Sequence, residues 1–351
     1  IGYSGISGLD DFTISSSGSS INLTDSSGNV ISYSGIENLS VNSKSYEYLN
    51  DTPINSGDGG IQNAYWSAAD SQIISTGNTI WYAQNIGTAF SGLSASDDLA
   101  FLGSSSGETI NLNIDRSSTY TGNLNITLGD GNDSILSAKV KNSDSINMGA
   151  GDDTMYVMVS GSNGTPNLSS LNLALLDGGA GVDTLAFEES TIANGTTLNL
   201  TTGGATNFEN LRGSASNETL NGDNNDNILW GLGGDDTISG LGGDDILYAA
   251  SSSMPGIGSG ASNQSGADNL YGGSGDDQLY GSAGNNLFDG GTGADTIATG
   301  DGNDTIVLRA GDGGSTLADA DIITDFSDGS DVLSMTGLGF SDFGIAQGVG
   351  S

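Results

Sequence analysis

Between Gly213 and Val307 an apolar residue recurs at every ninth position, and most of the places between are filled by turn residues. The first run starts at Gly213 and reads GSASNETLN, GDNNDNILW, GLGGDDTIS and GLGGDDILY. The second starts at Asn263 and reads NQSGADNLY, GGSGDDQLY, GSAGNNLFD, GGTGADTIA and TGDGNDTIV. The apolar residues occupy the eighth position of each unit: Leu220, Leu229, Ile238, Leu247, Leu270, Leu279, Phe288, Ile297 and Ile306. Six turn residues followed by three extended ones wind a parallel solenoid, so we expect this column to be its core.

Upstream of the nine-residue pattern, in residues 106–212, apolar and polar residues alternate over short stretches such as TINLNID, GNLNITL and TTLNL. Alternation of this kind, as at Ile110 and Leu112, predicts β-strands with one buried face. Several stretches lie next to turns such as GDGND, whose aspartates are 20 and 30 residues apart. The simplest interpretation is a β-solenoid with wide, irregular coils. A β-sandwich is the alternative, because antiparallel strands alternate in the same way.

The remaining segments complete an all-β prediction. Residues 1–105 form a β-rich N-terminal region, although Asn63–Ala69 is compatible with one or two helical turns. Residues 106–212 are the irregular solenoid, 213–307 the tight roll with a loop insertion at 249–262, and 308–351 a C-terminal cap. We expect apolar residues of the cap to cover the open end of the core column. These residues are Ile322, Ile323, Phe326, Val332, Leu333, Leu338 and Phe340.

Polar residues of the nine-residue units predict a cation site. Glycine among the first four positions allows positive φ angles and close approach of the backbone to an ion. The sixth position always carries an oxygen donor, the ligand type that a hard cation such as Ca²⁺ selects. These donors are Asp236, Asp245, Asp268, Asp277, Asp295, Asp304, Glu218, Asn227 and Asn286. The glycines assigned to the same sites are Gly231, Gly233, Gly240, Gly242, Gly272, Gly275, Gly290 and Gly293. The alternative is that these are ordinary turn residues.

The units resemble the calcium-binding nonapeptide G-G-x-G-x-D-x-U-x of the RTX (repeats-in-toxin) family of secreted bacterial proteins. The resemblance implies a β-roll in which two units make one coil and each ion lies between coils, held by sixth-position carboxylates and backbone carbonyls. Pairing units on the same side of such a roll gives about five ions. Sites that involve Asn227, Asn286 or the glycine-poor unit at Gly213 are expected to be weak or empty. The C-terminal phrase ADIITDFSDGSDVLS also resembles segments that follow RTX rolls, and Asp325, Asp328 and Asp331 in it are further candidate ligands.

Three turns upstream of the nine-residue units copy the same motif. They place Asp133, Asp153 and Asp183 after glycine-rich stretches, so we include these three aspartates among the predicted metal ligands.

The charge of the chain strengthens the case for calcium. There are 43 acidic residues and 6 basic ones, giving a formal net charge of −37. Such a surface repels nucleic acid and anionic lipid, and it repels itself unless cations neutralise it. We therefore expect calcium to be a structural component and its binding to supply free energy of folding.

Several classes of chemistry are excluded or weakened by composition. The chain has no cysteine and no histidine, so it lacks disulfides, thiol catalysis and any Ser-His-Asp triad. Its sequence has no apolar run of membrane-spanning length and no signal peptide at its start. The first residue is Ile1 rather than Met, which suggests a fragment or a processed product. The RTX resemblance implies export by a type I route and an extracellular location, associated with the cell surface.

Three functional hypotheses follow. The first is a non-enzymatic, calcium-dependent structural protein of the bacterial surface, S-layer-like or an adhesin, with a lattice or filament of its own copies or a cell-surface polysaccharide as partner. The second is the C-terminal secretion and folding module of an exported enzyme or toxin. The third is a polysaccharide lyase or epimerase, which the scarcity of basic residues disfavours.

Overall fold

The computed structural model describes residues 12–17, 20–27, 30–34, 38–41, 44–50, 61–67, 72–82, 94, 96–112, 121–158, 173–187, 192–250, 266–312, 320–327 and 330–337. The chain folds into two compact units. Unit 1 comprises residues 1–192 and 200–210, and unit 2 comprises residues 193–199 and 211–351. The described residues are almost entirely β-strands and turns, with no α-helix in these ranges. The four-region division predicted from the sequence stays a prediction.

Unit 1 begins with antiparallel strands. β1 (Thr13–Ser17), β2 (Ser20–Thr24) and β3 (Val30–Ser34) form one small sheet. β4 (Asn38–Val41), β5 (Lys44–Asn50), β6 (Ile61–Ser67) and β7 (Gln72–Tyr82) pair antiparallel in sequence order. The helical turns considered for Asn63–Ala69 are wrong as far as Ser67, because β6 is paired on both sides. Ala64 and Trp66 are both buried, which is the two-residue period of a strand.

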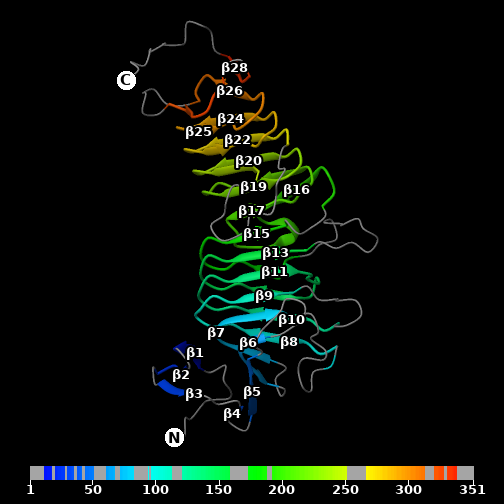
Figure 1. Cartoon of the computed structure of the whole chain (residues 1–351), viewed down its shortest axis with the longest axis vertical. Helices are drawn as coiled ribbons and strands as arrows, with labels where there is room; N and C mark the ends of the chain where they lie inside the picture. The colour runs from blue at the N-terminus through cyan, green and yellow to red at the C-terminus, as the bar shows by residue number, and fades with distance from the viewer. Residues whose placement is uncertain are drawn as a thin grey trace. The chain divides into compact units, whose positions relative to one another are not determined.

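The rest of unit 1 is a parallel solenoid with two stacks of strands. One stack contains β8 (Leu99–Leu102), β10 (Leu124–Thr127), β12 (Ser145–Asn147) and β14 (Leu176–Asp177). The other contains β9 (Thr109–Asn111), β11 (Ser134–Ala138), β13 (Thr154–Val157) and β15 (Thr184–Ala186). Successive coils are offset by 25, 20 and 30 residues. Parallel register excludes the β-sandwich for these strands and confirms the solenoid (Figure 1). A 3₁₀ turn, η3, covers Thr202–Gly204.

Unit 2 has the same kind of parallel architecture, with tighter coils. One stack contains β17 (Asn210–Arg212), β19 (Ile228–Leu232), β21 (Ile246–Ala250), β23 (Gln278–Tyr280), β25 (Thr296–Ala298) and β27 (Ile322–Ile323). The other contains β16 (Thr196–Asn199), β18 (Glu218–Asn221), β20 (Thr237–Gly242), β22 (Asn269–Ser274), β24 (Leu287–Thr292), β26 (Thr305–Arg309) and β28 (Val332–Thr336). Figure 1 shows these strands as successive rungs, from green β17 to red β28.

The predicted core column of unit 2 is confirmed. All nine eighth-position side chains are at most 1% exposed, and they pair along the stacks, for example Leu270 with Phe288 and Phe288 with Ile306. Most coils are offset by 18 residues, which is two nonapeptides. One coil is offset by 32 residues, and this is where the sequence places the insertion. β21 extends to Ala250, so the first two residues assigned to the insertion belong to a strand, and 251–262 lie outside the described residues.

The C-terminal segment adds another coil over the end of the roll, and Ile297 and Ile306 beneath it are at most 1% exposed. β27 pairs with β25 and β28 pairs with β26, which places Leu333 beyond Ile306 in the column. Leu333 is nevertheless 38% exposed, because no further described strand follows it. Ile322, Phe326 and Val332 are also exposed, so these three expected cap residues are not buried in the column themselves. Leu338 and Phe340 lie outside the described residues.

Candidate metal sites at the turns

The turns of unit 2 depend on glycine at particular positions. Gly275 and Gly293, at the fourth position of their units, have φ angles of +140° and +142°. A Cβ on either would clash with the carbonyl oxygen of the glycine one coil earlier. In the GLGG units the fourth-position glycines with positive φ are Gly234 and Gly243. The predicted Gly233 and Gly242 instead donate backbone hydrogen bonds to the preceding coil.

The second position of these turns also requires a positive φ. Gly273 and Gly291 supply it at +122° and +100°. In the two GLGG units leucine occupies this position, and Leu232 and Leu241 adopt φ angles of +80° and +83°. These conformations are unfavourable for a branched side chain. The sequence analysis did not predict a positive φ at these two leucines, because it did not distinguish the second position from the other three that glycine can occupy.

The first-position glycines leave space beside the sixth-position carboxylates. A Cβ on Gly231, Gly240, Gly272 or Gly290 would run into Oδ2 of the aspartate five residues later. At Gly231 and Gly240 a carbonyl oxygen from the next coil would also lie only 2.8 Å from that added Cβ. Each of these two turns therefore brings one carboxylate oxygen and one carbonyl oxygen to a position that only glycine leaves open.

The sixth-position side chains form two hydrogen-bonded columns. In each coil, Oδ1 accepts a hydrogen bond from the backbone N–H of the sixth-position residue one coil earlier. Asp277 Oδ1 accepts from Asp245 N at 2.7 Å, and Asp295 Oδ1 accepts from Asp277 N at 2.9 Å. The same bond joins Asp236 to Glu218, Asp268 to Asp236, Asp245 to Asn227 and Asp304 to Asn286. The backbone thus fixes each carboxylate in place by one of its two oxygens.

The second carboxylate oxygen is buried without a partner at five of these positions. Within the described part of unit 2, Oδ2 has no hydrogen-bond partner at Asp236, Asp245, Asp277, Asp295 and Asp304. All five residues are at most 1% exposed. An unpaired buried carboxylate oxygen is costly, which a bound cation would relieve. The residues present therefore fit Ca²⁺, and since no three acidic side chains converge in the described chain, carbonyl oxygens and water must complete the shell.

The pKa values of these groups reflect the same burial. Desolvation raises the pKa of Asp236 to about 8 and the pKa of Asp245, Asp277 and Asp295 to about 7. Desolvation also raises the pKa of Asp304 above its usual range. Without a cation, the buried columns thus favour bound protons near neutral pH. A divalent cation would compete with these protons.

Other predicted ligands are satisfied within their own turns. Both oxygens of Glu218 accept hydrogen bonds from Ser214, one from the hydroxyl and one from the backbone N–H at 3.0 Å. Asn227 Oδ1 accepts from Asp223 N at 2.8 Å, and its amide N donates to the Asp223 carboxylate at 3.4 Å.

In the turn at 281–286 the side-chain polar groups also have hydrogen-bond partners within the protein. The Ser282 hydroxyl donates to Asp268 Oδ2 at 3.0 Å, and the Asn286 amide donates to Gly284 O at 3.1 Å. Among the turns of unit 2 whose second position the structure describes, those with Ser or Asp there are hydrogen-bonded, whereas those with Gly or Leu there leave Oδ2 unpaired. Sequence reasoning missed this role of the second position.

Aspartates of the C-terminal segment accept the last backbone hydrogen bond of each column. Asp331 Oδ1 accepts from Asp304 N at 3.1 Å and its Oδ2 accepts from Ser327 N at 2.7 Å. Asp321, which the sequence reasoning missed, accepts from Asp295 N at 3.2 Å. Asp325 accepts from Thr299 N at 2.7 Å. These contacts give Asp325 and Asp331 backbone donors as partners, and Asp328 lies outside the described residues.

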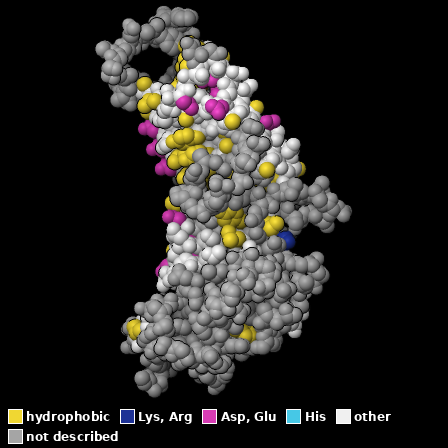
Figure 2. All heavy atoms as spheres, viewed as in Figure 1, with side chains coloured by type: hydrophobic (Ala, Val, Ile, Leu, Met, Phe, Trp, Pro, Cys, Tyr) yellow, Lys and Arg dark blue, Asp and Glu magenta, His cyan; other side chains and the backbone are white. Residues whose placement is uncertain are grey.

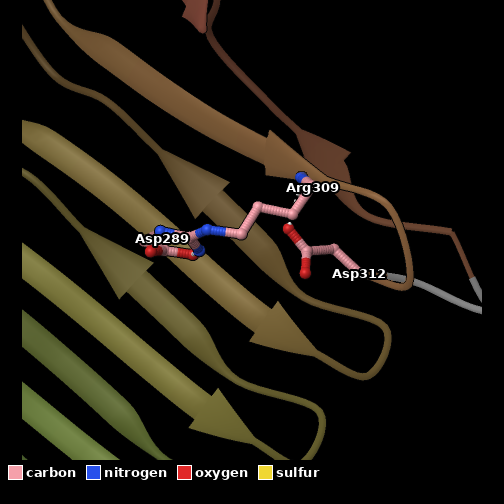
Figure 3. Close-up of polar contacts among 3 residues, drawn as sticks. All are labelled: Asp289, Arg309 and Asp312. Atoms are coloured by element: carbon pink, nitrogen blue, oxygen red, sulfur yellow. Dashed lines mark hydrogen bonds and ion pairs between the residues drawn. The ribbon is translucent and has the colours of Figure 1, made fainter. Parts of the chain in front are cut away.

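One buried acid in unit 2 is neutralised by a side chain. Asp289 on β24 is 7% exposed and forms an ion pair with Arg309 on β26 (Figure 3). The backbone N–H of Arg309 donates to Asp312 Oδ2 at 2.6 Å, which holds the start of the next turn. The hydrogen bond to Asp289 raises the pKa of Arg309 further.

The surface around the turns is acidic. Figure 2 shows Asp and Glu side chains along the edge of the stacked strands, with hydrophobic side chains beside them on the same face. The fifth-position residues Asp235, Asp244 and Asp276 are exposed next to the buried sixth-position acids. Each accepts a backbone N–H from the following coil. The turns therefore carry paired negative charge, and cations bound there would reduce the mutual repulsion of the coils.

The predicted ligands in unit 1 occupy equivalent turns. Asp133, Asp153 and Asp183 are at most 1% exposed, and each has an Oδ2 without a partner in the described residues. Desolvation raises their pKa values to about 8, 6 and 7.

Comparison with known proteins identifies the repeats of unit 2. The family model of the RTX calcium-binding nonapeptide repeat matches residues 212–249, 264–297 and 280–313. The RTX resemblance is thus confirmed for these segments, and Ca²⁺ is the cofactor of such repeats. A search among curated proteins found no match. None of the helical turns in the described chain has the length and apolar character needed to cross a membrane.

Proposed function

We propose that this chain, which carries RTX calcium-binding repeats, is an extracellular structural protein of a bacterial surface that folds and assembles when it binds calcium. RTX repeats are typical of secreted proteins, which supports the extracellular location. An S-layer-like lattice or an adhesive filament is the role that best accounts for a chain dominated by solenoid coils.

One observation carries the proposal: five buried carboxylates of unit 2 repeat in register with an oxygen that has no partner in the described structure. Such oxygens favour a folded state only when cations or protons reach them. Extracellular calcium modules typically bind with dissociation constants on the order of 10⁻⁴ to 10⁻³ M, far above cytosolic calcium. Folding would thus be coupled to arrival outside the cell.

Self-association is supported by the end of unit 2. Ile322, Phe326, Val332, Leu333 and Met335 are between 38% and 58% exposed on or near the last described strands. Among the described strands, β27 pairs in parallel with β25 alone and β28 with β26 alone. Exposed apolar edge strands are ready to pair with another chain. The net charge of −37 opposes such contact until cations reduce it.

The proposal is tested by electron microscopy and light scattering of the purified chain during titration with millimolar Ca²⁺. Ordered sheets or filaments that dissolve in chelator are the expected result, with Mg²⁺ at equal ionic strength as the control. A monodisperse folded monomer at high protein concentration would contradict assembly. Binding of that monomer to cell-surface polysaccharide would then favour an adhesin, whereas its absence would favour a folding module of a larger exported protein.

A further inference from the structure

Unit 1 contains three turns built like those of the roll, although residues 212–313 alone match the repeat family. The turns lie at Gly129–Asp133, Gly149–Asp153 and Gly179–Asp183, on coils offset by 20 and 30 residues instead of 18. A nine-residue repeat therefore cannot describe them, although the sequence shows the same turn motif, and the structure adds their hydrogen bonds and their buried unpaired oxygens.

The carboxylates of these turns form a column of their own. Asp153 Oδ1 accepts from Asp133 N at 2.7 Å, and Asp183 Oδ1 accepts from Asp153 N at 2.8 Å. Asp133 Oδ1 accepts from Glu108 N, and Asp183 N donates to Glu209 Oε2 at 2.8 Å. This is the bond pattern of unit 2, with one oxygen of each aspartate fixed by the backbone and the other unpaired and buried.

The fourth position of these turns, and the second position of the last two, has the same glycine requirement as in the roll, whereas the first position is Leu128 at Asp133 and Met148 at Asp153. Gly149 and Gly179 at the second position have φ angles of +105° and +109°. Gly131, Gly151 and Gly181 at the fourth position have φ angles of +109°, +140° and +148°. A Cβ on Gly151 or Gly181 would clash with the carbonyl oxygen of the fourth-position glycine one coil earlier. The carbonyl oxygens of these glycines are thus stacked from coil to coil within the same turns, and such oxygens are ligands that a hard cation takes.

The turn that precedes the column is different and provides an internal contrast. Glu108 accepts hydrogen bonds from the hydroxyls of Ser104 at 2.6 Å and Ser75 at 2.8 Å, and from Ser104 N at 3.3 Å. Its sequence, GSSSGET, parallels GSASNET at 213–219, where Ser214 likewise donates to Glu218 from its hydroxyl and its backbone N–H. The column of unit 1 and the unit 2 column that contains Asp236 therefore each border a serine-glutamate turn whose carboxylate is already satisfied.

We propose that unit 1 holds its own calcium sites, one at each of Asp133, Asp153 and Asp183, and that the Ser104–Glu108 turn beside them is closed without a cation. The partnerless buried Oδ2 atoms carry the argument, because they are what distinguishes these three turns from the Glu108 turn. The proposal requires that the chain binds calcium, but not that it assembles at a surface.

The test is a count of calcium ions per folded full-length chain, measured by equilibrium dialysis and elemental analysis. If one ion binds at each partnerless carboxylate, the five in unit 2 and three in unit 1 give about eight ions, whereas the roll alone gives about five. Asp133→Asn with Asp153→Asn keeps both Oδ1 acceptors and should remove about two ions. The matched control is Asp130→Asn with Asp152→Asn, which makes the same charge change in the same turns at exposed positions and should leave the count unchanged.

Each outcome decides the proposal. A wild-type count of about five, or an unchanged count in the Asp133/Asp153 variant, overturns it and leaves calcium binding by the roll intact. A wild-type count near zero would overturn calcium-dependent folding altogether. Glu108→Gln should leave the count unchanged, and a loss of one ion there would contradict closure of that turn by hydrogen bonds. If the double variant fails to fold, the wild-type count and the single Asp153→Asn variant still decide.

Discussion

Replacing Asp277 with asparagine separates its role as a metal ligand from its role as a hydrogen-bond acceptor. Asp277 lies in the middle of an uninterrupted column, between Asp245 and Asp295. Asparagine retains an Oδ1 that accepts from Asp245 N, so the 2.7 Å hydrogen bond survives the change. What is lost is the charge and the partnerless Oδ2. We expect the calcium concentration needed for folding to rise.

The size of the rise follows from binding linkage. Each site adds RT ln(1 + [Ca²⁺]/Kd) to stability, about 1.4 kcal/mol when calcium is tenfold above a dissociation constant on the order of 10⁻³ M. If about five equal sites support folding and one is lost, the remaining four supply the same total free energy when the calcium concentration is about twofold higher, so the midpoint rises about twofold. If Asp277 contributes to the ions on both sides of its coil, three sites must suffice and the midpoint rises about fivefold. A two- to fivefold rise is thus the expected range.

Far-UV circular dichroism during calcium titration measures the midpoint. Asp276→Asn is the matched control, because Asp276 is the exposed neighbour in the same turn and loses the same charge. Its midpoint should shift much less. In excess chelator above pH 8 the Asp277→Asn variant should retain at least as much β-structure as the wild type. Burial raises the pKa of Asp277, so its ionised carboxylate destabilises the calcium-free fold, and asparagine removes that charge. Equal midpoints for the two variants would refute the assignment of Asp277 as a ligand.

Three further predictions follow from the same contacts. In chelator, β-structure should be retained near pH 4 and be lost as the pH rises from about 4 to about 8, because the folded-state pKa of groups such as Asp236, about 8, lies above the ordinary 3.8, so that protons stabilise the fold. For the same reason the calcium midpoint for folding, measured by circular dichroism, should decrease as the pH falls below 7. Ser282→Gly with Asn286→Asp should create a turn of the binding type, adding about one ion per chain and lowering the midpoint, whereas Asn286→Asp alone keeps the hydroxyl and should add less. Arg309→Ala should lower the free energy of unfolding in saturating calcium by about 1–3 kcal/mol because it leaves buried Asp289 without its cation, and Arg309→Lys should restore part of the loss in urea denaturation.

The sequence was sufficient for the features that repeat at constant spacing. The core column was predicted residue by residue because a side chain at every ninth place must face the same way in a roll. A parallel solenoid was also anticipated from residue 106 onward, with a β-sandwich as the alternative, since alternating stretches such as GNLNITL lie next to turns like those of the roll. The helical alternative for Asn63–Ala69 failed because so short a stretch shows no clear period, and pairing with β5 and β7 decided its structure.

Features that depend on contacts between coils could not be predicted. Nothing in GSAGNN indicates that the Ser282 hydroxyl reaches Asp268, 14 residues earlier, because this requires the three-dimensional neighbour. The positive φ of Leu232 and Leu241 is likewise imposed by the turn against the preference of leucine. The exposure of Leu333 was missed because the sequence shows an apolar residue at the right place but not whether another coil follows.

The two columns of unit 2 should respond differently to the loss of a ligand. In one column Asp245, Asp277 and Asp295 follow each other, so each lies next to another partnerless carboxylate. In the other column the Ser282 turn separates Asp236 from Asp304. Neighbouring bound ions stabilise the same backbone, so their contributions are coupled, whereas sites separated by a hydrogen-bonded turn are closer to additive. Replacement of Asp304 with asparagine should therefore shift the calcium midpoint less than the same change at Asp277, although both remove one buried carboxylate.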